Sequence, residues 1–314
     1  MKKVFIDGSE GTTGLRIYER FMNRDDIELL KITPELRKDP AERKKLINQS
    51  DITFLCLPDA AAIESVSLVE NENVKIIDAS TAHRTKEGWA YGFPELSDEF
   101  KNKIKEGKRI AVPGCYASGF NAIVYPLVKK GIIGNDYPVS SFAISGYSGA
   151  GKNMIAKYDD ENRTDDYNAP RPYALTQQHK HLKEMKFISD LAEEPLFSPI
   201  IADYYAGMVV SIPLYASMLK EKMTLKDIHS FYAKYYEGKQ FIKVMPFGIE
   251  EDLNGFLPAN ACAGWDGMEI FITGNDDRIL ISSRFDNLGK GASGAAIQCM
   301  NIMLDCEEDK GLNL

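Results

Sequence analysis

Hydrophobic positions follow two alternating periods along the first 115 residues. Short apolar runs, which predict strands, occupy residues 2–7, 27–32, 52–57, 74–78 and 109–112. Between them, helical spacing predicts helices over residues 12–22, from Pro40 onward and over residues 60–69. The strand runs are short and unbroken by polar residues, which is typical of parallel strands covered on both faces. The alternation therefore predicts an α/β fold with a doubly wound parallel sheet of the Rossmann type.

The pattern changes after residue 115. A helix is predicted over residues 121–130, and strand-like runs then dominate with few helices between them. These runs occupy residues 139–145, 208–214, 241–245, 269–273 and 278–283. A turn at residues 274–277 joins the last two strands, and residues 291–304 predict a final amphipathic helix. We therefore expect a second region of α+β type with a largely antiparallel sheet.

Composition excludes several classes of protein. The chain has 314 residues, of which 44% are hydrophobic and 27% charged, as is ordinary for a globular protein. A net charge of −8 argues against a nucleic-acid partner, because phosphate contacts need a basic face. The five cysteines are scattered without a CxxC pair, which argues against zinc and disulfides and for a reducing compartment. Because there is neither a leader-like segment nor an apolar stretch of about 20 residues, we expect a cytoplasmic protein with no membrane partner.

A glycine-rich loop lies between the first strand and the first helix. Glycine permits a tight turn and a close approach of a diphosphate, and the helix N-terminus offers free amides to it. The GxxGxxG spacing has one residue more than the common fingerprint, but its place after the first parallel strand predicts dinucleotide binding. The residues expected at the cofactor are those of the loop, with three that follow later strands: Gly8, Ser9, Gly11, Thr12, Thr13, Gly14, Leu57, Pro58 and Ser80.

The second strand bears on the choice of cofactor. An enzyme that uses NAD usually has an acidic residue at the end of this strand, where it holds the ribose hydroxyls. Here the strand is followed by Arg37 and Lys38, a cationic pair that can meet a 2′-phosphate, although Glu35 lies close to them. We therefore predict NADP as the cofactor.

Cys115 follows the strand at residues 109–112 and opens a helix. Backbone amides and the positive helix end favour a thiolate there, and a thiolate is a strong nucleophile for an acyl carbon. The other cysteines, at positions 56, 262, 299 and 306, occupy apolar or helical settings that predict ordinary packing. Cys115 is the predicted nucleophile.

His179 and His181 are two of only four histidines, and they are two positions apart. On a regular helix their side chains point in different directions, so they cannot both serve one site, and this pattern alone does not choose between them. No third ligand cluster accompanies them, so we expect no metal. His229 lies in a predicted surface helix over residues 224–236, where a structural role is expected.

Two segments are suited to an anion. Arg84 follows the fourth strand at the edge of the sheet where ligands bind. Residues 146–152 form a second glycine-rich loop, in which Ser148, Gly149 and Lys152 offer hydroxyl, amide and ammonium donors. Substrate binding is the prediction for these four residues.

Taken together, these segments resemble the N-acetyl-gamma-glutamyl-phosphate reductase family in its short form. The segments that carry the resemblance are residues 8–14, 57–59, 78–84, 92–96, 114–116, 145–152, 179–184 and 289–296. There are departures: Ala117-Ser118 stands where the family usually has Pro-Thr. Lys152 and Lys183 stand where the long form has Arg and Pro.

The resemblance implies an NADP-binding domain of residues 1–115 with 286–314, and a substrate and oligomerisation domain of residues 116–285. It implies a homo-oligomer, a dimer or tetramer, that acts on a small acyl phosphate and releases inorganic phosphate. Cys115 is the nucleophile by this resemblance, His179 the acid/base, and Tyr173 and Glu184 supporting residues of the substrate site. The implied reaction proceeds through a thioester on Cys115, which NADPH reduces to a semialdehyde.

Three other interpretations stay open. Aspartate-semialdehyde dehydrogenase shares the architecture and the cysteine chemistry, but its cysteine typically follows Asn, whereas Gly114 precedes Cys115 here. A reductase of a carrier-linked aminoadipyl phosphate is a second alternative. A non-catalytic nucleotide-sensing protein is an alternative of another class.

Overall fold

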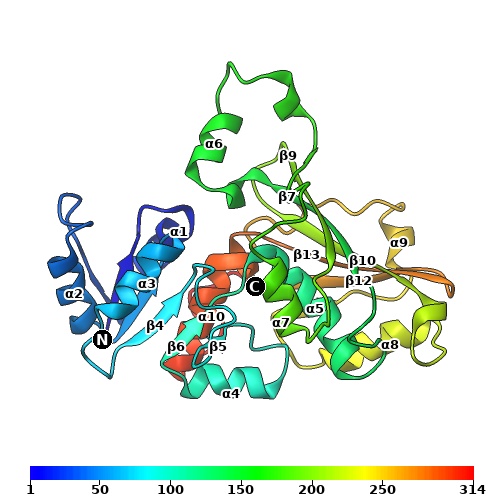
Figure 1. Ribbon diagram of the computed structural model, residues 1–314, viewed down its shortest axis with the longest axis horizontal. Coiled ribbons are helices and arrows are strands. Elements are labelled where there is room, and N and C mark those ends of the chain that lie inside the picture. Colours follow the sequence, from blue (N-terminus) through cyan, green and yellow to red (C-terminus); the bar gives the residue numbers. More distant parts are fainter. The chain divides into compact units, whose positions relative to one another are not determined.

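The computed structural model describes residues 1–314, and the chain divides into two units (Figure 1). The first comprises Met1–Gly114 and Ala292–Asn313, and the second comprises Cys115–Gly291. The chain thus passes directly from the first unit into the second at Cys115, and it returns at Ala292 rather than at residue 286. No helix is both long and apolar enough to cross a bilayer.

The first unit contains a six-stranded sheet in the order β2-β1-β3-β4-β6-β5. All of its pairings are parallel, which confirms the predicted sheet. Its strands are β1 (Lys2–Asp7), β2 (Ile27–Leu30), β3 (Ile52–Leu55), β4 (Lys75–Asp78), β5 (Ala90–Tyr91) and β6 (Arg109–Ala111). β5 has two residues, which are too few for a period of two to be recognised in the sequence.

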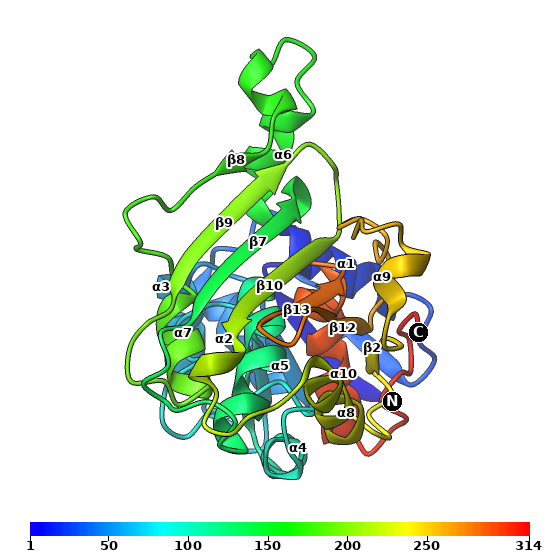
Figure 2. The ribbon, with the colours of Figure 1, turned by 90° about the vertical axis from the view of Figure 1, so that its right-hand side faces the viewer.

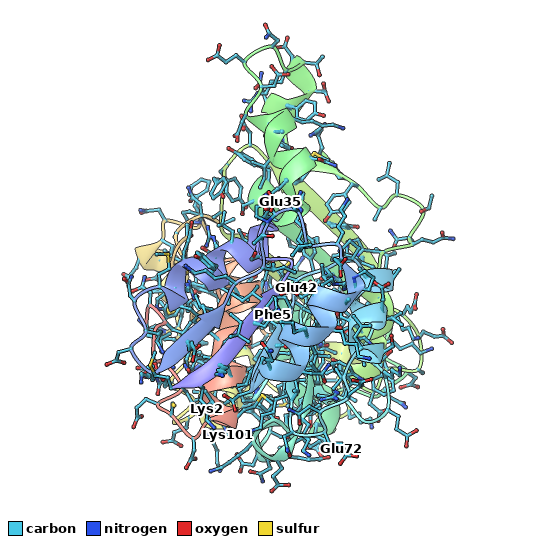
Figure 3. The ribbon with its side chains drawn as sticks, turned by 90° about the vertical axis from the view of Figure 1, so that its left-hand side faces the viewer. Lys2, Phe5, Glu35, Glu42, Glu72 and Lys101 are labelled. Atoms are coloured by element: carbon cyan, nitrogen blue, oxygen red, sulfur yellow. The ribbon has the colours of Figure 1, made fainter.

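Helices pack on both faces of this sheet. They are α1 (Thr12–Phe21), α2 (Pro40–Gln49), α3 (Asp59–Ser67), α4 (Asp98–Glu106) and α10 (Gly294–Met303). Val4 and Ile6 pack in a core with residues of α1 and α10, whereas Phe5 packs with residues of α2 and α3. Figure 3 shows Phe5 midway along β1, with Lys2 at the amino end of the sheet and Glu35 at its carboxyl end. The alternation along β1 thus fills two cores, as expected for a parallel sheet.

The final helix differs from its predicted character. All ten residues of α10 are buried, so the expected amphipathic pattern is wrong. Its apolar residues pack against the sheet, while the buried Gln298 donates hydrogen bonds to Glu95 (2.7 Å) and Glu308 (2.9 Å). The polar side chain of Gln298 is therefore bonded inside the protein, to Glu95 in the loop before α4 and to Glu308 in the C-terminal segment, and it does not face solvent.

The second unit contains a seven-stranded sheet in the order β11-β12-β13-β10-β7-β9-β8. Its strands are β7 (Ser140–Gly146), β8 (Arg171–Pro172), β9 (Leu196–Ala202), β10 (Met208–Tyr215), β11 (Ile242–Val244), β12 (Met268–Gly274) and β13 (Arg278–Phe285). Pairing is antiparallel except between β11 and β12 and between β7 and β9, which confirms a largely antiparallel sheet. β9 was not predicted, since Pro199 interrupts its pattern.

The helices of the second unit are α5 (Cys115–Lys129), α6 (Lys152–Tyr158), α7 (Leu182–Ile188), α8 (Leu225–Tyr235) and α9 (Ile249–Asp252). Single turns occur at η1 (Tyr147–Ala150), η2 (Asp165–Asn168), η3 (Ala216–Met218) and η4 (Gly289–Ser293). In the second unit α5 packs against β10 and β13, α8 packs against β12 and α7 packs against α5, while Figure 2 shows β9, β7 and β10 running side by side. On the other face Phe142, Leu196 and Tyr215 are 44%, 60% and 59% exposed. This face therefore carries apolar side chains that the rest of the chain leaves exposed.

Candidate active site

The glycine loop joins β1 to α1, and two of its glycines are sterically required. Gly8 has a φ of +91°, and a Cβ there would overlap the carbonyl oxygen of Cys56. A Cβ at Gly14 would overlap the carbonyl oxygen of Gly8, so the first turn of the helix packs directly on the loop. Leu57 lies against Gly8 from the end of β3. The loop therefore presents close-packed backbone at the carboxyl edge of the sheet, as a diphosphate site requires.

Other residues predicted at the cofactor surround this loop. Thr12 and Thr13 form the first turn of α1, and Pro58 precedes the first turn of α3. The Arg37 guanidinium pairs with the carboxylate of Glu10 in the loop. Lys38, which follows Arg37, is exposed. A pocket of about 190 Å³ lies beside the loop, and it is lined by Ile6, Ser9, Tyr18, Leu29, Leu30, Lys31 and Ile32. The structure thus brings the cationic segment and the loop together.

Residues after β4 form a buried polar group. The backbone N–H and hydroxyl of Ser80 donate to the Asp78 carboxylate (2.8 and 2.7 Å). The same carboxylate contacts His83 Nδ1 (2.6 Å), and the imidazole stacks on Trp89. Arg84 is 8% exposed and donates to the carbonyls of Val112 (2.9 Å) and Ala79 (3.2 Å). Arg84 therefore connects the carboxyl ends of β4 and β6, and substrate binding by Arg84 stays a prediction.

The predicted nucleophile occupies the first residue of α5. Cys115 is partly exposed, and the helix that it opens is buried along most of its length. A Cβ at Gly291 would lie 2.9 Å from the Cβ of Cys115, so the chain at Gly291 packs on the nucleophile. By contrast, burial raises the pKa of Cys56, and burial beside Glu269 raises that of Cys262 to about 12. Both of these thiols are protonated at neutral pH.

Aromatic side chains join the histidines to the neighbourhood of Cys115. The Tyr173 hydroxyl donates to the Tyr116 hydroxyl (3.0 Å), and the ring of Tyr116 lies 5.8 Å from that of His179. Burial raises the pKa of Tyr116 and of Tyr173, and the negative charge of Cys115 adds to each shift. The thiol, the two phenols and His179 are therefore neighbours within the second unit.

The two histidines lie together, although side chains two positions apart would point in different directions on a regular helix. Residues 179–181 precede α7 and are not helical, so that helical geometry is absent. The ring centroids of His179 and His181 are 4.7 Å apart, and the backbone N–H of His181 donates to His179 Nδ1 (3.2 Å). His181 is 4% exposed, whereas His179 is partly exposed. Burial, with a smaller effect of Lys180, lowers the pKa of His179 to about 4.

The second glycine-rich loop follows β7. Ser148 is fully enclosed and accepts a hydrogen bond from the side chain of Asn287 (2.9 Å). Gly149 and Lys152 are exposed. Glu184 lies in α7 and is 2% exposed. The exposed part of the loop is free to meet an anion, while Ser148 supports it from below.

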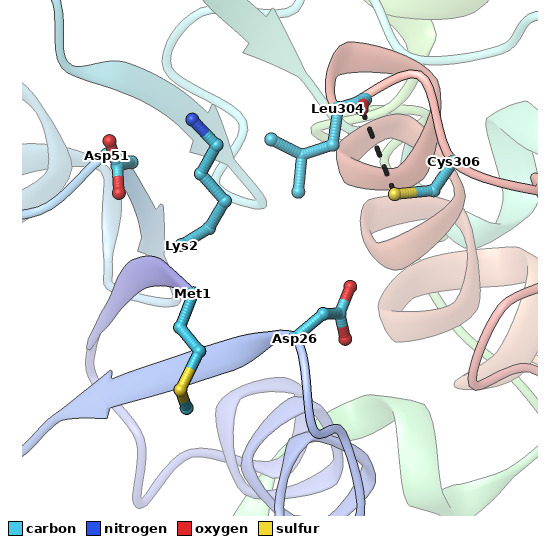
Figure 4. Close-up of a pocket in the computed structure, with 6 residues that line it drawn as sticks. All are labelled: Met1, Lys2, Asp26, Asp51, Leu304 and Cys306. Atoms are coloured by element: carbon cyan, nitrogen blue, oxygen red, sulfur yellow. Dashed lines mark hydrogen bonds between the residues drawn. The ribbon is translucent and has the colours of Figure 1, made fainter.

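A further pocket, of about 450 Å³, lies at the opposite edge of the first sheet (Figure 4). Its lining comprises Met1, Lys2, Asp26, Asp51, Leu304 and Cys306, at the amino ends of β1 and β2 and after α10. In parallel sheets ligands bind at the carboxyl ends of the strands. None of the predicted site residues lines this pocket, so it is no part of the candidate site.

Comparisons with known proteins decide the family. Residues 4–104 match the model described as semialdehyde dehydrogenase, NAD binding domain, and residues 115–287 match the semialdehyde dehydrogenase dimerisation domain. N-acetyl-gamma-glutamyl-phosphate reductase 2 of Nostoc sp. is 48% identical over 319 residues, with 99% of each chain covered. The reductase of Sinorhizobium medicae is 43% identical over 307 residues, with 96% of this chain and 98% of its own covered. The chain belongs to the N-acetyl-gamma-glutamyl-phosphate reductase family.

Membership of this reductase family confirms the resemblance seen in the sequence, and the NAD binding model confirms a nucleotide-binding domain. Among solved structures, aspartate semialdehyde dehydrogenase from Francisella tularensis has a TM-score of 0.73, at 17% identity, with 97% of this chain and 100% of that chain covered. Aspartate semialdehyde dehydrogenase II from Vibrio cholerae gives the same TM-score at 15% identity. At such identities the likeness shows the fold alone.

Two residues of the candidate site in this reductase were missed by sequence reasoning. Tyr116 follows the nucleophile directly, and its place in the second position of a buried helix was the available signal. Asn287 lies just beyond β13, far in sequence from the loop that it contacts. No local pattern links it to Ser148, because that contact depends on how the sheet folds.

Proposed function

We propose that this protein reduces N-acetyl-L-glutamyl 5-phosphate to N-acetyl-L-glutamate 5-semialdehyde and inorganic phosphate, with NADPH, in arginine biosynthesis. The observation that carries the proposal is the place of Cys115, a partly exposed thiol at the start of a buried helix near Tyr173, whose ring in turn lies near that of His179. Relatives named for this activity cover the chain from end to end.

The nucleotide fits the first unit on steric grounds. Gly8 and Gly14 leave no room for a Cβ, so the backbone is close-packed where a diphosphate approaches, and α1 begins there. The loop would hold the diphosphate, and Arg37 with Lys38 would meet a 2′-phosphate. NADPH supplies the hydride when it is bound.

The residues of the second unit supply the covalent steps. The Cys115 thiolate attacks the acyl carbon, the bond from that carbon to the phosphate oxygen breaks, and inorganic phosphate leaves. After reduction of the thioester, the carbon–sulfur bond breaks and Cys115 is regenerated as a thiolate. Loop residues Gly149 and Lys152 bind the phosphate. His179 donates a hydrogen bond to the substrate oxygen that becomes negatively charged during the reaction. Tyr173 supports the site beside His179: the two ring centroids lie 5.9 Å apart, and the Tyr173 hydroxyl donates to that of Tyr116.

A homo-oligomer is part of the proposal. The match to a dimerisation domain spans the second unit, and the open face of its sheet carries Phe142, Leu196 and Tyr215. In register, Phe142 pairs with Ser211 and Ser198, Leu196 pairs with Ser140, and Tyr215 pairs with Arg278, so the face combines apolar side chains with serines and one cation. An exposed face of this kind is typical of an interface. The cytoplasmic location stays a prediction from the sequence.

The reverse reaction tests the proposed activity most directly. N-acetylglutamate semialdehyde, NADP and inorganic phosphate are mixed with the protein, and NADPH absorbance is followed. We expect turnover with this aldehyde and none of comparable efficiency with aspartate semialdehyde or with a carrier-linked aminoadipate semialdehyde. Tight NADP binding without turnover on any of the three would instead favour a nucleotide sensor.

Cofactor preference gives a second measurement. We expect Arg37→Ala to raise the KM for NADPH about ten-fold, because a hydrogen-bonded charge contact to a phosphate contributes about 1.5 kcal/mol. The KM for NADH should change less than two-fold. Lys44→Ala is the matched control, since this exposed cation on α2 pairs with Glu70 away from the loop. Equal efficiency of the unaltered protein with NADH and NADPH would contradict the prediction, as would an equal loss with both in Arg37→Ala.

A further inference from the structure

Asn287 joins two segments that are distant in sequence. Its side chain is 1% exposed, and both of its polar atoms are used. Oδ1 accepts from the backbone N–H of Gly207 (2.8 Å), which precedes β10, and Nδ2 donates to the hydroxyl oxygen of Ser148 (2.9 Å). A buried amide with both ends bonded holds one orientation. It therefore fixes the loop of residues 146–152 to the start of β10.

The loop packs closely on this side chain. A Cβ at Gly149 would lie 2.7 Å from Nδ2 of Asn287, so no larger residue fits there without a shift. The backbone N–H of Gly146 donates to the carbonyl of Gly207 (3.0 Å), which closes the same corner from the other side. The exposed part of the loop, at Gly149, therefore rests directly on Asn287.

The turn that carries Asn287 also reaches the nucleophile. The carboxylate of Asp286 accepts hydrogen bonds from the backbone N–H groups of Leu288 (2.7 Å) and Gly289 (3.0 Å). The backbone carbonyl of Asp286 accepts a hydrogen bond from the backbone N–H of Gly291 (3.0 Å). Gly291 in turn packs on Cys115, as the 2.9 Å approach shows. Residues 286–291 therefore contact the anion loop at one end and the thiol at the other.

We infer that Asn287 is a positioning residue for the phosphate end of the substrate, which it serves by holding the residue 146–152 loop at a fixed place relative to Cys115. The inference rests on the proposed function, since it assumes that the phosphate of the acyl phosphate is the anion of this loop. The bond to Ser148 has a direction: the amide nitrogen donates, and the hydroxyl accepts. A carboxylate at position 287 would reverse that direction and would add a negative charge beneath the loop.

The test measures phosphate separately from the other substrates. In the reverse assay, Asn287→Asp should raise the KM for inorganic phosphate by about ten- to a hundred-fold, because a displacement of about 1 Å has effects of this size. The KM for the semialdehyde should stay within two-fold. The rate at which iodoacetamide alkylates Cys115 should also stay within two-fold, because the thiol is packed by Gly291 and not by the amide.

Two further variants separate positioning from simple stability. Asn287→Ala and Ser148→Ala each remove one end of the same bond, so the double variant should cost no more in phosphate KM than the worse single one. Asn301→Asp is the matched control: this buried asparagine bonds Arg24 and the carbonyl of Lys310 in the first unit. It should lower the thermal midpoint without changing the KM for phosphate. A phosphate KM that is unchanged in folded Asn287→Asp, or that rises only together with every other constant, would overturn the inference.

Phosphate binding can also be measured without turnover, so this test of Asn287 does not depend on the proposed reaction. Inorganic phosphate alone should raise the thermal midpoint of the unaltered protein, because a ligand that binds the folded state stabilises it. The rise should be absent in Asn287→Asp. An equal rise in both proteins, or none in the unaltered protein, overturns the role of Asn287 whatever aldehyde the enzyme uses. Failure of the semialdehyde assay alongside a selective phosphate response would overturn the proposed substrate instead.

Discussion

Replacement of Cys115 by alanine removes turnover, with an expected fall in kcat of about 10⁴-fold or more, because the covalent route is lost entirely. The affinity for NADP should stay within two-fold, since the glycine loop and Arg37 belong to the first unit. The measurements are steady-state turnover in the reverse direction and NADP binding by fluorescence titration. A trapped acyl adduct on the unaltered protein, located on Cys115 by mass spectrometry, would support the thioester.

Cys306→Ala is the control for this prediction. Cys306 is also a partly exposed thiol, but it lines the pocket at the amino edge of the first sheet (Figure 4). Its replacement should leave turnover within two-fold and should leave the adduct on Cys115 in place. Activity of more than a few per cent in Cys115→Ala would exclude the thioester mechanism.

Local features of the site were predictable where a short segment determines the geometry. The loop from Gly8 to Gly14 is an example, since its glycines are required by contacts within one strand–loop–helix unit. The capping of α2 is another: the Asp39 side chain accepts from the N–H groups of Ala41 and Glu42, and Pro40 opens the helix. Cys115 was placed correctly at the start of a helix for the same reason.

Features that depend on distant contacts were not predictable from the pattern. α10 has polar positions that suggested an exposed side, but Gln298 is buried between Glu95 and Glu308. Asn287 gains its role from Ser148, which lies 139 positions away. His179 and His181 were expected to diverge on a helix, whereas the segment is irregular and brings their rings together. Periodicity describes regular elements, and this part of the site lies between them.

The adjacency of the two imidazoles changes the reason for choosing His179 as the catalytic histidine. The direction of the side chains does not distinguish His179 from His181, but their burial and hydrogen bonding do. His181 is 4% exposed and packs against Tyr116 at 6.0 Å. The N–H of His181 donates to Nδ1 of His179, so the neutral His179 ring carries its proton on Nε2. Because its pKa is lowered to about 4, that neutral form is present at neutral pH, and it offers an N–H donor to an oxygen that becomes negative.

His179→Asn should therefore lower kcat by about 10²–10⁴-fold with little change in thermal midpoint at pH 7.5, whereas His181→Asn should mainly lower the midpoint. The pH dependence of stability gives an independent measurement. Between pH 6.5 and pH 4 the unfolded chain binds a proton at His179 that the folded chain does not, so this residue makes stability fall as the pH falls through that window. The midpoint of the unaltered protein should then decline more steeply from pH 7 to pH 4.5 than that of His179→Asn. A large loss of rate in a well-folded His181→Asn, beside a nearly active His179→Asn, would assign the reaction to the other imidazole.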